Sequence, residues 1–225
     1  MKRFVALFLL MSGLLVAGIG YVSAGTTTLV TYPFSPAGNI LPSVVGVGVT
    51  PTLTLPSNLN SYSVGPDGFG NVLQAYPQTG STSSVNTVSY YTLSLTTNAS
   101  GGLGQLTVSF GVGKGGNSDP RGVLARSSLN NYGTDVFSLT LPSGVQAAPA
   151  PQSFTVDASG QSAITLRFYV WAPGNGNSVD FSNLSVTTPT PAPSAVPTLS
   201  EWSQLLLGLM VISMIGWHFH RERSY

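Results

Sequence analysis

Three residues whose types suit ligand binding share one face of a predicted strand. Residues 163–172 alternate between apolar side chains such as Leu166 and a second set that contains Arg167, Tyr169 and Trp171. Because successive side chains of a strand point to opposite faces, a buried Leu166 would place the second set outward. There the aromatic rings could stack on a sugar ring while the guanidinium hydrogen-bonds its hydroxyls. The alternative is packing under a loop, with Arg167 in a structural salt bridge.

Side chains that commonly catalyse reactions are scarce in the central part of the chain. Residues 25–195 contain no histidine, cysteine or glutamate. This absence excludes a Ser-His-Asp triad, a His-Glu zinc site and a cysteine nucleophile there. A glycosidase would need two carboxyls about 5–10 Å apart, and the aspartates present are isolated and mostly lie beside turns. We expect no catalytic residues, with an aspartate-dependent polysaccharide hydrolase as the remaining enzymatic alternative.

The chain carries little charge: 7% of its residues are charged, and its formal net charge is +1. In residues 25–195, four basic residues stand against five aspartates. No basic patch is available for nucleic acid, whose binding depends on phosphate neutralisation. The absence of cysteine excludes disulfides, so stability must come from core burial.

Short alternating segments predict an all-β domain. The clearest are residues 105–112 and 163–172, and eight more fall at 27–34, 44–55, 72–76, 87–96, 122–129, 136–141, 153–157 and 178–187. The glycine-rich residues 111–116 lack the spacing of a phosphate loop and are interpreted as a turn. About ten short strands separated by turns predict an antiparallel β-sandwich or a barrel over residues 25–187.

The N-terminus has the pattern of a secretory signal peptide. Lys2 and Arg3 precede an apolar stretch at 4–19, and small residues follow up to Ala24. We expect residues 1–24 to form a signal-peptide helix, to engage the Sec translocon and to be cleaved after Ala24 by signal peptidase. A retained N-terminal anchor is the alternative.

The C-terminus predicts a second membrane segment. Residues 188–195 form a Pro-rich linker, which favours an extended spacer. A transmembrane helix is expected at about 203–219, followed by a basic tail with Arg221 and Arg223 that should stay cytoplasmic. A buried core helix is the alternative.

The segment before this helix resembles a known sorting signal. Its residues are Val196, Pro197, Thr198, Leu199, Ser200, Glu201 and Trp202. Together with the helix and basic tail at 196–225, this motif resembles the IPTL-CTERM sorting domain, from which it departs at Val196. The resemblance implies processing by an exosortase-like membrane protease.

A second resemblance concerns residues 25–187. Asp119-Pro120-Arg121, the strand Ile164-Thr165-Leu166-Arg167 and the closing Asn183-Leu184-Ser185-Val186 are similar to segments of jelly-roll, galactose-binding-like ectodomains that precede such signals. The chain departs from that pattern at Asn130-Asn131 and Ser182. The resemblance implies a jelly-roll sandwich and a possible structural calcium ion at Asp180 and Asn183, with no other cofactor.

These features predict an exported, non-catalytic cell-surface or extracellular-matrix protein of a Gram-negative bacterium. It would cross the inner membrane and then be sorted to the cell surface, outer membrane or matrix. By resemblance, such proteins accompany exopolysaccharide or biofilm production. The alternative function is a carbohydrate-binding module of the cell envelope or biofilm matrix, with polysaccharide as its partner.

Overall fold

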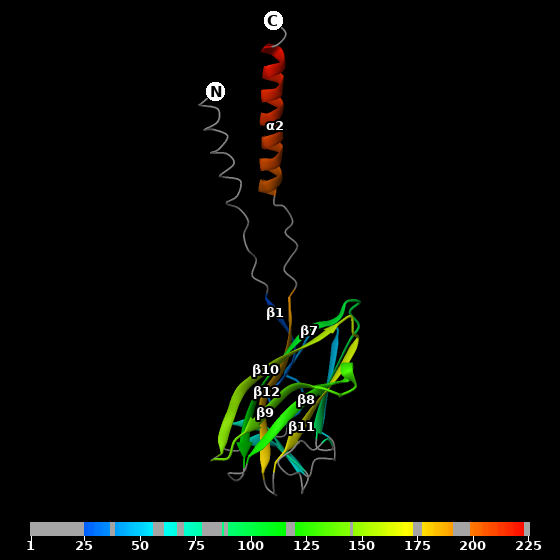
Figure 1. Ribbon diagram of the computed structural model, residues 1–225, viewed down its shortest axis with the longest axis vertical. Coiled ribbons are helices and arrows are strands. Elements are labelled where there is room, and N and C mark those ends of the chain that lie inside the picture. Colours follow the sequence, from blue (N-terminus) through cyan, green and yellow to red (C-terminus); the bar gives the residue numbers. More distant parts are fainter. Residues whose placement is uncertain are drawn as a thin grey trace. The chain divides into compact units, whose positions relative to one another are not determined.

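The computed structural model describes residues 25–36, 39–55, 61–66, 70–77, 87, 90–115, 120–144, 146–172, 177–190 and 199–222. The chain divides into two units. One, Thr26–Thr190, holds all the described strands; the other contains the helix α2 (Leu199–Glu222) (Figure 1). The predicted all-β class of the central domain is confirmed.

Seven strands form one antiparallel sheet, called sheet A. They are β1 (Thr26–Tyr32), β2 (Val44–Val45), β4 (Ser61–Pro66), β5 (Asn71–Tyr76), β7 (Gly102–Gly115), β10 (Ala147–Ser159) and β12 (Ser178–Pro189). Their main order is β10–β7–β12–β1–β2, and β5 pairs with both β12 and β4. β12 therefore lies in the interior of the sheet, while β10 lies at an edge.

Five strands form the second antiparallel sheet, called sheet B. They are β3 (Val49–Thr54), β6 (Tyr90–Thr97), β8 (Arg121–Ser127), β9 (Asp135–Leu141) and β11 (Ala163–Trp171). The order is β3–β6–β11–β8–β9, so β11 is the central strand. A 3-10 helix, η1 (Ser128–Asn130), follows β8.

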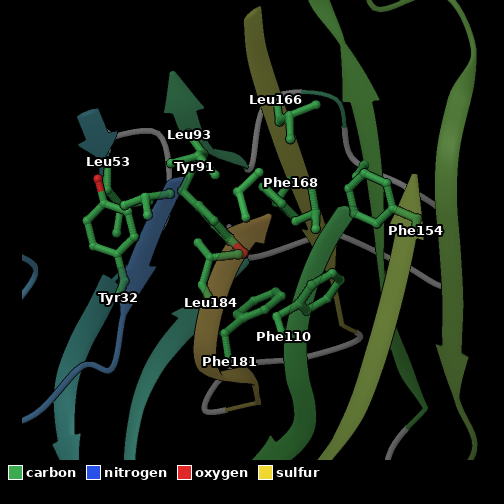
Figure 2. Packing of buried hydrophobic residues seen from close by; sticks show 14 of the residues in the cluster. Tyr32, Leu53, Tyr91, Leu93, Phe110, Phe154, Leu166, Phe168, Phe181 and Leu184 are labelled. Carbon is green, nitrogen blue, oxygen red and sulfur yellow. The ribbon is translucent and has the colours of Figure 1, made fainter. Parts of the chain in front are cut away.

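The apolar faces of the two sheets meet in an aromatic core (Figure 2). Tyr91 of sheet B stacks on Phe168 of the neighbouring strand, with ring centroids 4.7 Å apart, and its edge contacts Phe181 of sheet A at 5.0 Å. Phe110 of sheet A contacts Phe168 across the sandwich at 5.6 Å. The chain contains no cysteine and hence no disulfide, so aromatic and aliphatic burial must hold the sheets together.

The glycine-rich residues 111–116 were predicted to form a turn at the end of the strand 105–112, and this prediction is wrong for residues 113–115, which continue β7. Gly111, Gly113 and Gly115 occupy one face of the strand. A Cβ atom on Gly113 would lie 2.5 Å from the Ala147 carbonyl oxygen and 2.7 Å from the Pro149 nitrogen. The glycines therefore allow the irregular start of β10 to lie directly against β7.

The boundaries of several other strands differ from the predictions. The segment 44–55 was predicted as one strand, but the turn at Gly46–Gly48 divides it between β2 of sheet A and β3 of sheet B. β10 starts six residues earlier than the predicted position 153, because an edge strand tolerates prolines such as Pro149 and Pro151. β12 extends through Pro189, two residues into the predicted linker.

α2 covers the residues predicted to be helical near the C-terminus. Its exposed apolar side chains are Leu205, Leu206, Leu207, Leu209, Met210, Ile212, Met214, Ile215 and Trp217. Consecutive residues are about 100° apart around a helix, so Leu205–Leu207 alone reach most of its circumference. Among the described residues, no helix combines the length and apolar character needed to cross a membrane.

Two buried tyrosines offer a test of the core. Among the described residues, the hydroxyls of Tyr91 and Tyr32 have no hydrogen-bond partner. Tyr91→Phe keeps the ring stack on Phe168 and removes a buried polar atom. We expect it to raise the free energy of unfolding by about 1 kcal/mol and the Tm by about 2–4 °C, measured by urea and thermal denaturation.

The same variant should respond differently to alkaline pH. Burial raises the pKa of Tyr91 well above its ordinary value of 10.0, and that of Tyr32 to about 12. A raised folded-state pKa contributes stability below pH 10 that is lost as the pH rises through the folded-state value. The loss between pH 10 and about 12 should therefore be smaller in Tyr91→Phe. Tyr76→Phe, on a half-buried tyrosine, is the control, and a less stable Tyr91→Phe would contradict the prediction.

Candidate functional site

The outer face of sheet B, which points away from the core, carries a polar row that crosses all five strands. Its members lie opposite one another in register: Thr54, Thr92, Arg167, Arg126 and Asp135. Because β11 is central, Arg167 stands in the middle of this row. The row arises from strand alternation, since Leu53, Leu93, Leu166 and Ala125 point into the core from adjacent positions.

A second row on this face consists of hydroxyl side chains. Thr52 lies opposite Ser94, which lies opposite Thr165. The Ser94 and Thr165 hydroxyl oxygens are 3.0 Å apart, within hydrogen-bond distance. The Thr165 amide donates to the Ser128 hydroxyl at 3.0 Å, which ties η1 to the sheet. The face therefore offers hydrogen-bonding groups on one side of the Arg167 row.

An aromatic and apolar row lies on the other side of Arg167. Tyr90 lies opposite Tyr169, and Tyr169 lies opposite Leu124. The rings of Tyr90 and Tyr169 are 5.1 Å apart and tilted by 56°. Tyr90 is half-buried, whereas Tyr169 and Leu124 are only 3% and 2% exposed. The outer face thus changes from hydroxyl groups to aromatic rings across the Arg167 row.

Arg167 lies against two tyrosine rings. Its guanidinium carbon is 3.7 Å from the ring centroid of Tyr132 and 4.9 Å from that of Tyr90. Both distances are within the range of cation–π attraction. Burial lowers the pKa of Arg167, whereas a hydrogen bond with Tyr169 and the electrostatic effect of Tyr90, Tyr132 and Tyr169 raise it. The raising effects are larger in sum, so the pKa of Arg167 is above its usual value. Arg167 therefore stays charged.

The turn after η1 holds Tyr132 against Arg167. Asn131 and Tyr132 have φ angles of 53° and 59°, and such left-handed conformations are costly for a bulky residue. The Tyr132 amide donates to the Ser127 carbonyl at 2.9 Å, and its own carbonyl accepts from Arg126 at 3.4 Å. These bonds offset the strain of the turn.

Arg126 is engaged differently from Arg167. Its Nε donates to the Asp135 carboxylate at 2.6 Å, and its guanidinium carbon lies 5.5 Å from the Tyr169 ring centroid. The two side chains are 24% and 41% exposed, so solvent weakens this ion pair. Arg126 is therefore largely neutralised by its own neighbour.

Arg167, Tyr169 and Trp171 do share the outer face, but two of them are buried. Trp171 is 7% exposed, and its indole lies over Gly122, where a Cβ atom would approach Nε1 to 2.5 Å. Packing against the sheet thus accounts for Tyr169 and Trp171, and the accessible rings are those of Tyr90 and Tyr132. Sequence reasoning missed both as candidate site residues, although Tyr90 lies within the strand predicted at 87–96.

A separate polar cluster lies inside the sandwich. Arg121 is fully buried and donates to the Ser178 carbonyl at 2.8 Å, to the Asn177 side chain at 3.2 Å and to the Gly115 carbonyl. Arg121 belongs to sheet B, whereas Ser178 and Gly115 belong to sheet A, so this side chain links the two sheets. Because Arg121 is buried, its role is to stabilise the fold rather than to bind a ligand.

The residues suggested for calcium have different surroundings. Asp180 is fully buried and accepts a hydrogen bond of 2.5 Å from Ser178. Asn183 is exposed at a bulge of β12, with a φ angle of 47°. The described residues contain no group of three His, Cys, Asp or Glu side chains that could hold a metal ion.

The described aspartates are also widely separated. Asp157 lies opposite Gln105 and Asp180 opposite Gly113, and these partners are eight positions apart on β7, roughly 26 Å. Asp135 lies on sheet B, in its ion pair with Arg126. Hydrogen bonds from the Ser159 side chain and backbone lower the pKa of the exposed Asp157. Asp67 and Asp119 lie outside the described residues.

The sorting and processing residues are only partly within the described chain. Ala24, the motif residues Val196, Pro197 and Thr198, and Arg223 lie outside it. Leu199, Ser200, Glu201, Trp202 and Arg221 lie in the helix α2. Cleavage at either end of the chain stays a prediction.

No family model matches the chain, and no curated protein matches it. Solved structures similar to it include a CBM29-2 mutant complexed with mannohexaose, at 20% identity and a TM-score of 0.36, covering 75% of this chain and 95% of that one. Another is the CBM22-1 xylan-binding domain from Paenibacillus barcinonensis Xyn10C, at 11% identity and a TM-score of 0.41, covering 76% and 100%. A third is CBM29_1 from Piromyces equi, at 15% identity and a TM-score of 0.38, covering 76% and 95%. Such distant likeness transfers no ligand to this chain.

The contact between Arg167 and Tyr132 can be measured directly. In a double-mutant cycle with Arg167→Gln and Tyr132→Leu, we expect a coupling energy of about 0.5–2 kcal/mol in urea unfolding. Leu keeps a side chain at the strained φ angle, so the cycle isolates the loss of the ring. Tyr132→Phe, which keeps the ring, should preserve the coupling. A coupling energy near zero would show that the two side chains do not stabilise each other.

Proposed function

We propose that the sandwich is a non-catalytic glycan-binding module and that its binding surface is the outer face of sheet B. The observation that carries this proposal is the order of rows on that face. Hydroxyl groups of Thr52, Ser94 and Thr165 lie on one side of Arg167, and the ring of Tyr90 lies on the other. The wide separation of Asp157 and Asp180 supports the non-catalytic part of this proposal, because glycoside hydrolysis needs two carboxyls close together.

The chemistry of a sugar ring matches this arrangement. A pyranose ring has an apolar C–H face and an edge of hydroxyl groups, so it needs an aromatic surface beside hydrogen-bonding groups. Binding sites commonly combine apolar contact with a few polar groups that fix orientation. Tyr90 and Tyr132 supply partly accessible rings, and Arg167 and the threonine and serine hydroxyls supply the polar groups.

The rigidity of the face supports binding as well. β11 is paired on both sides, and its inner residues Leu166 and Phe168 are fully buried. The Tyr132 turn is fixed by backbone hydrogen bonds to Ser127 and η1. A preorganised face loses little conformational entropy when a ligand binds, which favours affinity.

Glycan binding by the full chain in mild detergent tests this proposal. Affinity electrophoresis against a panel of neutral and acidic polysaccharides should show retardation by at least one of them. Tyr90→Ala should weaken that binding about tenfold or more, because it removes a partly accessible ring. The matched control is Tyr76→Ala, which removes a half-buried tyrosine on sheet A and should leave binding unchanged. Absence of binding, or equal loss in both variants, would contradict the proposal.

We also propose that residues 196–225 direct sorting, through membrane association of α2 and processing by an exosortase-like protease. The supporting observation is that exposed apolar side chains, such as those of Leu205, Leu206 and Leu207, are spread around α2. A helix that is apolar all round calls for an apolar environment. This proposal concerns the location of the protein and is independent of glycan binding.

Intact mass and membrane fractionation in the native host test the sorting proposal. We expect a product that has lost the helix and ends near Trp202. Replacing Pro197 and Trp202 of the motif by alanine should cause the precursor to accumulate in the inner membrane, while the conservative exchange Ile212→Leu within α2 should not. Wild-type protein that retains Tyr225 would contradict processing.

A further inference from the structure

The outer face of sheet B carries a positive charge that no described side chain neutralises. Its described charged groups are Arg167, Arg126 and Asp135. Asp135 pairs with Arg126. One acid against two arginines leaves a single net positive charge, located at Arg167.

The contacts of Arg167 hold its charge in place without cancelling it. Tyr132 and Tyr90 lie against the guanidinium and carry no net charge themselves. The Nε atom is buried and has no hydrogen-bond partner among the described residues. The side chain as a whole is half-buried, so the cation is partly withdrawn from water yet still reachable from the surface. A cation in this setting attracts an anion more strongly than one in bulk water.

The surroundings of Arg167 say more about the anion. Thr92 lies opposite it on β6, and the hydroxyl row of Ser94 and Thr165 lies two positions along the strands. An anionic group bound at Arg167 would therefore have alcohol groups as its neighbours. Arginine pairs especially well with planar carboxylates, through two parallel N–H···O bonds.

We propose that the glycan recognised by this face is a polyuronate, whose sugar carboxylate pairs with Arg167 while adjacent hydroxyls contact Thr92, Ser94 and Thr165. This inference rests on the proposed glycan binding and makes it more specific. Arg167 acts as the determinant of specificity for the acidic sugar. Tyr132 and Tyr90 act as positioning residues that hold the guanidinium.

The test compares the same polymers with and without their carboxylates. Polygalacturonate and polymannuronate are bound to the full chain in mild detergent, alongside the same polymers after chemical reduction of the carboxyl groups to alcohols. We expect at least one polyuronate to bind about tenfold or more tightly than its reduced form, and the preference to shrink as salt rises from about 0.05 to 0.5 M.

Variants then assign the preference to Arg167. Arg167→Gln should abolish it, and Arg167→Lys, which keeps the charge and loses the planar fork, should retain part of it. The control is Arg221→Gln, which removes one positive charge from α2 rather than from the sandwich and should keep the preference. Circular dichroism and Tm establish that each variant is folded.

The outcomes separate this inference from the proposed function. Equal or tighter binding of the reduced polymers, or of neutral glycans in place of polyuronates, would overturn the inference and leave glycan binding standing. A preference that survives in folded Arg167→Gln would also overturn it. Absence of binding to every glycan would defeat both proposals.

Discussion

The two-residue period of β11 is the constraint on which both the core and the candidate site depend. Leu166 and Phe168 are fully buried between the sheets, and this requirement fixes the direction of every other side chain on the strand. Arg167 must then point outward, together with Tyr169. A slip of one residue would bury a guanidinium among Phe110, Phe181 and Tyr91, at a free-energy cost that no nearby group offsets. The position of the site is therefore a consequence of core formation. It requires no separate folding determinant on the surface.

In sheet A, the irregular edge strand β10 packs against β7 in a sandwich that contains no disulfide. The glycine positions of β7 remove the Cβ atoms that would collide with Ala147 and Pro149 of β10. Pro149 and Pro151 lie on that edge strand, where a missing amide donor is tolerated and discourages pairing with another chain. At the end of the sheet, Arg121 reaches from β8 to backbone carbonyls of β7 and β12. Its complete burial is tolerable because carbonyl and amide oxygens receive its donors.

Strand alternation alone was sufficient to predict the all-β class and most strands, because those segments bury one face. It located β11 almost to the residue and assigned Arg167, Tyr169 and Trp171 to one face. It failed where prolines, glycines or contacts between paired strands determine the structure. Prolines concealed the start of β10, glycines in strand conformation resembled a turn in β7, and β4 (Ser61–Pro66) was not predicted. The burial of Trp171 depends on Gly122, which is its neighbour through the pairing of β8 with β11, strands separated in the chain by β9 and β10. Sequence spacing contains no information about such a contact.

The same reasoning explains why the composition of the site could not be predicted from one segment. Tyr90, Tyr132 and Arg126 come from three different elements and meet Arg167 only through the order β6–β11–β8 and the turn after η1.

In a chain with 7% charged residues, each charge on the face of a sheet needs a physical reason. Arg121 has internal acceptors and Arg126 has Asp135, so both are accounted for by the fold. Arg167 is held by rings that attract its charge and leave it uncancelled. A strained left-handed turn is maintained to place one of those rings. Strain of this kind persists where the surrounding structure imposes it, and it is concentrated at sites that hold ligands. We propose that an anion from outside the chain pairs with this uncancelled charge.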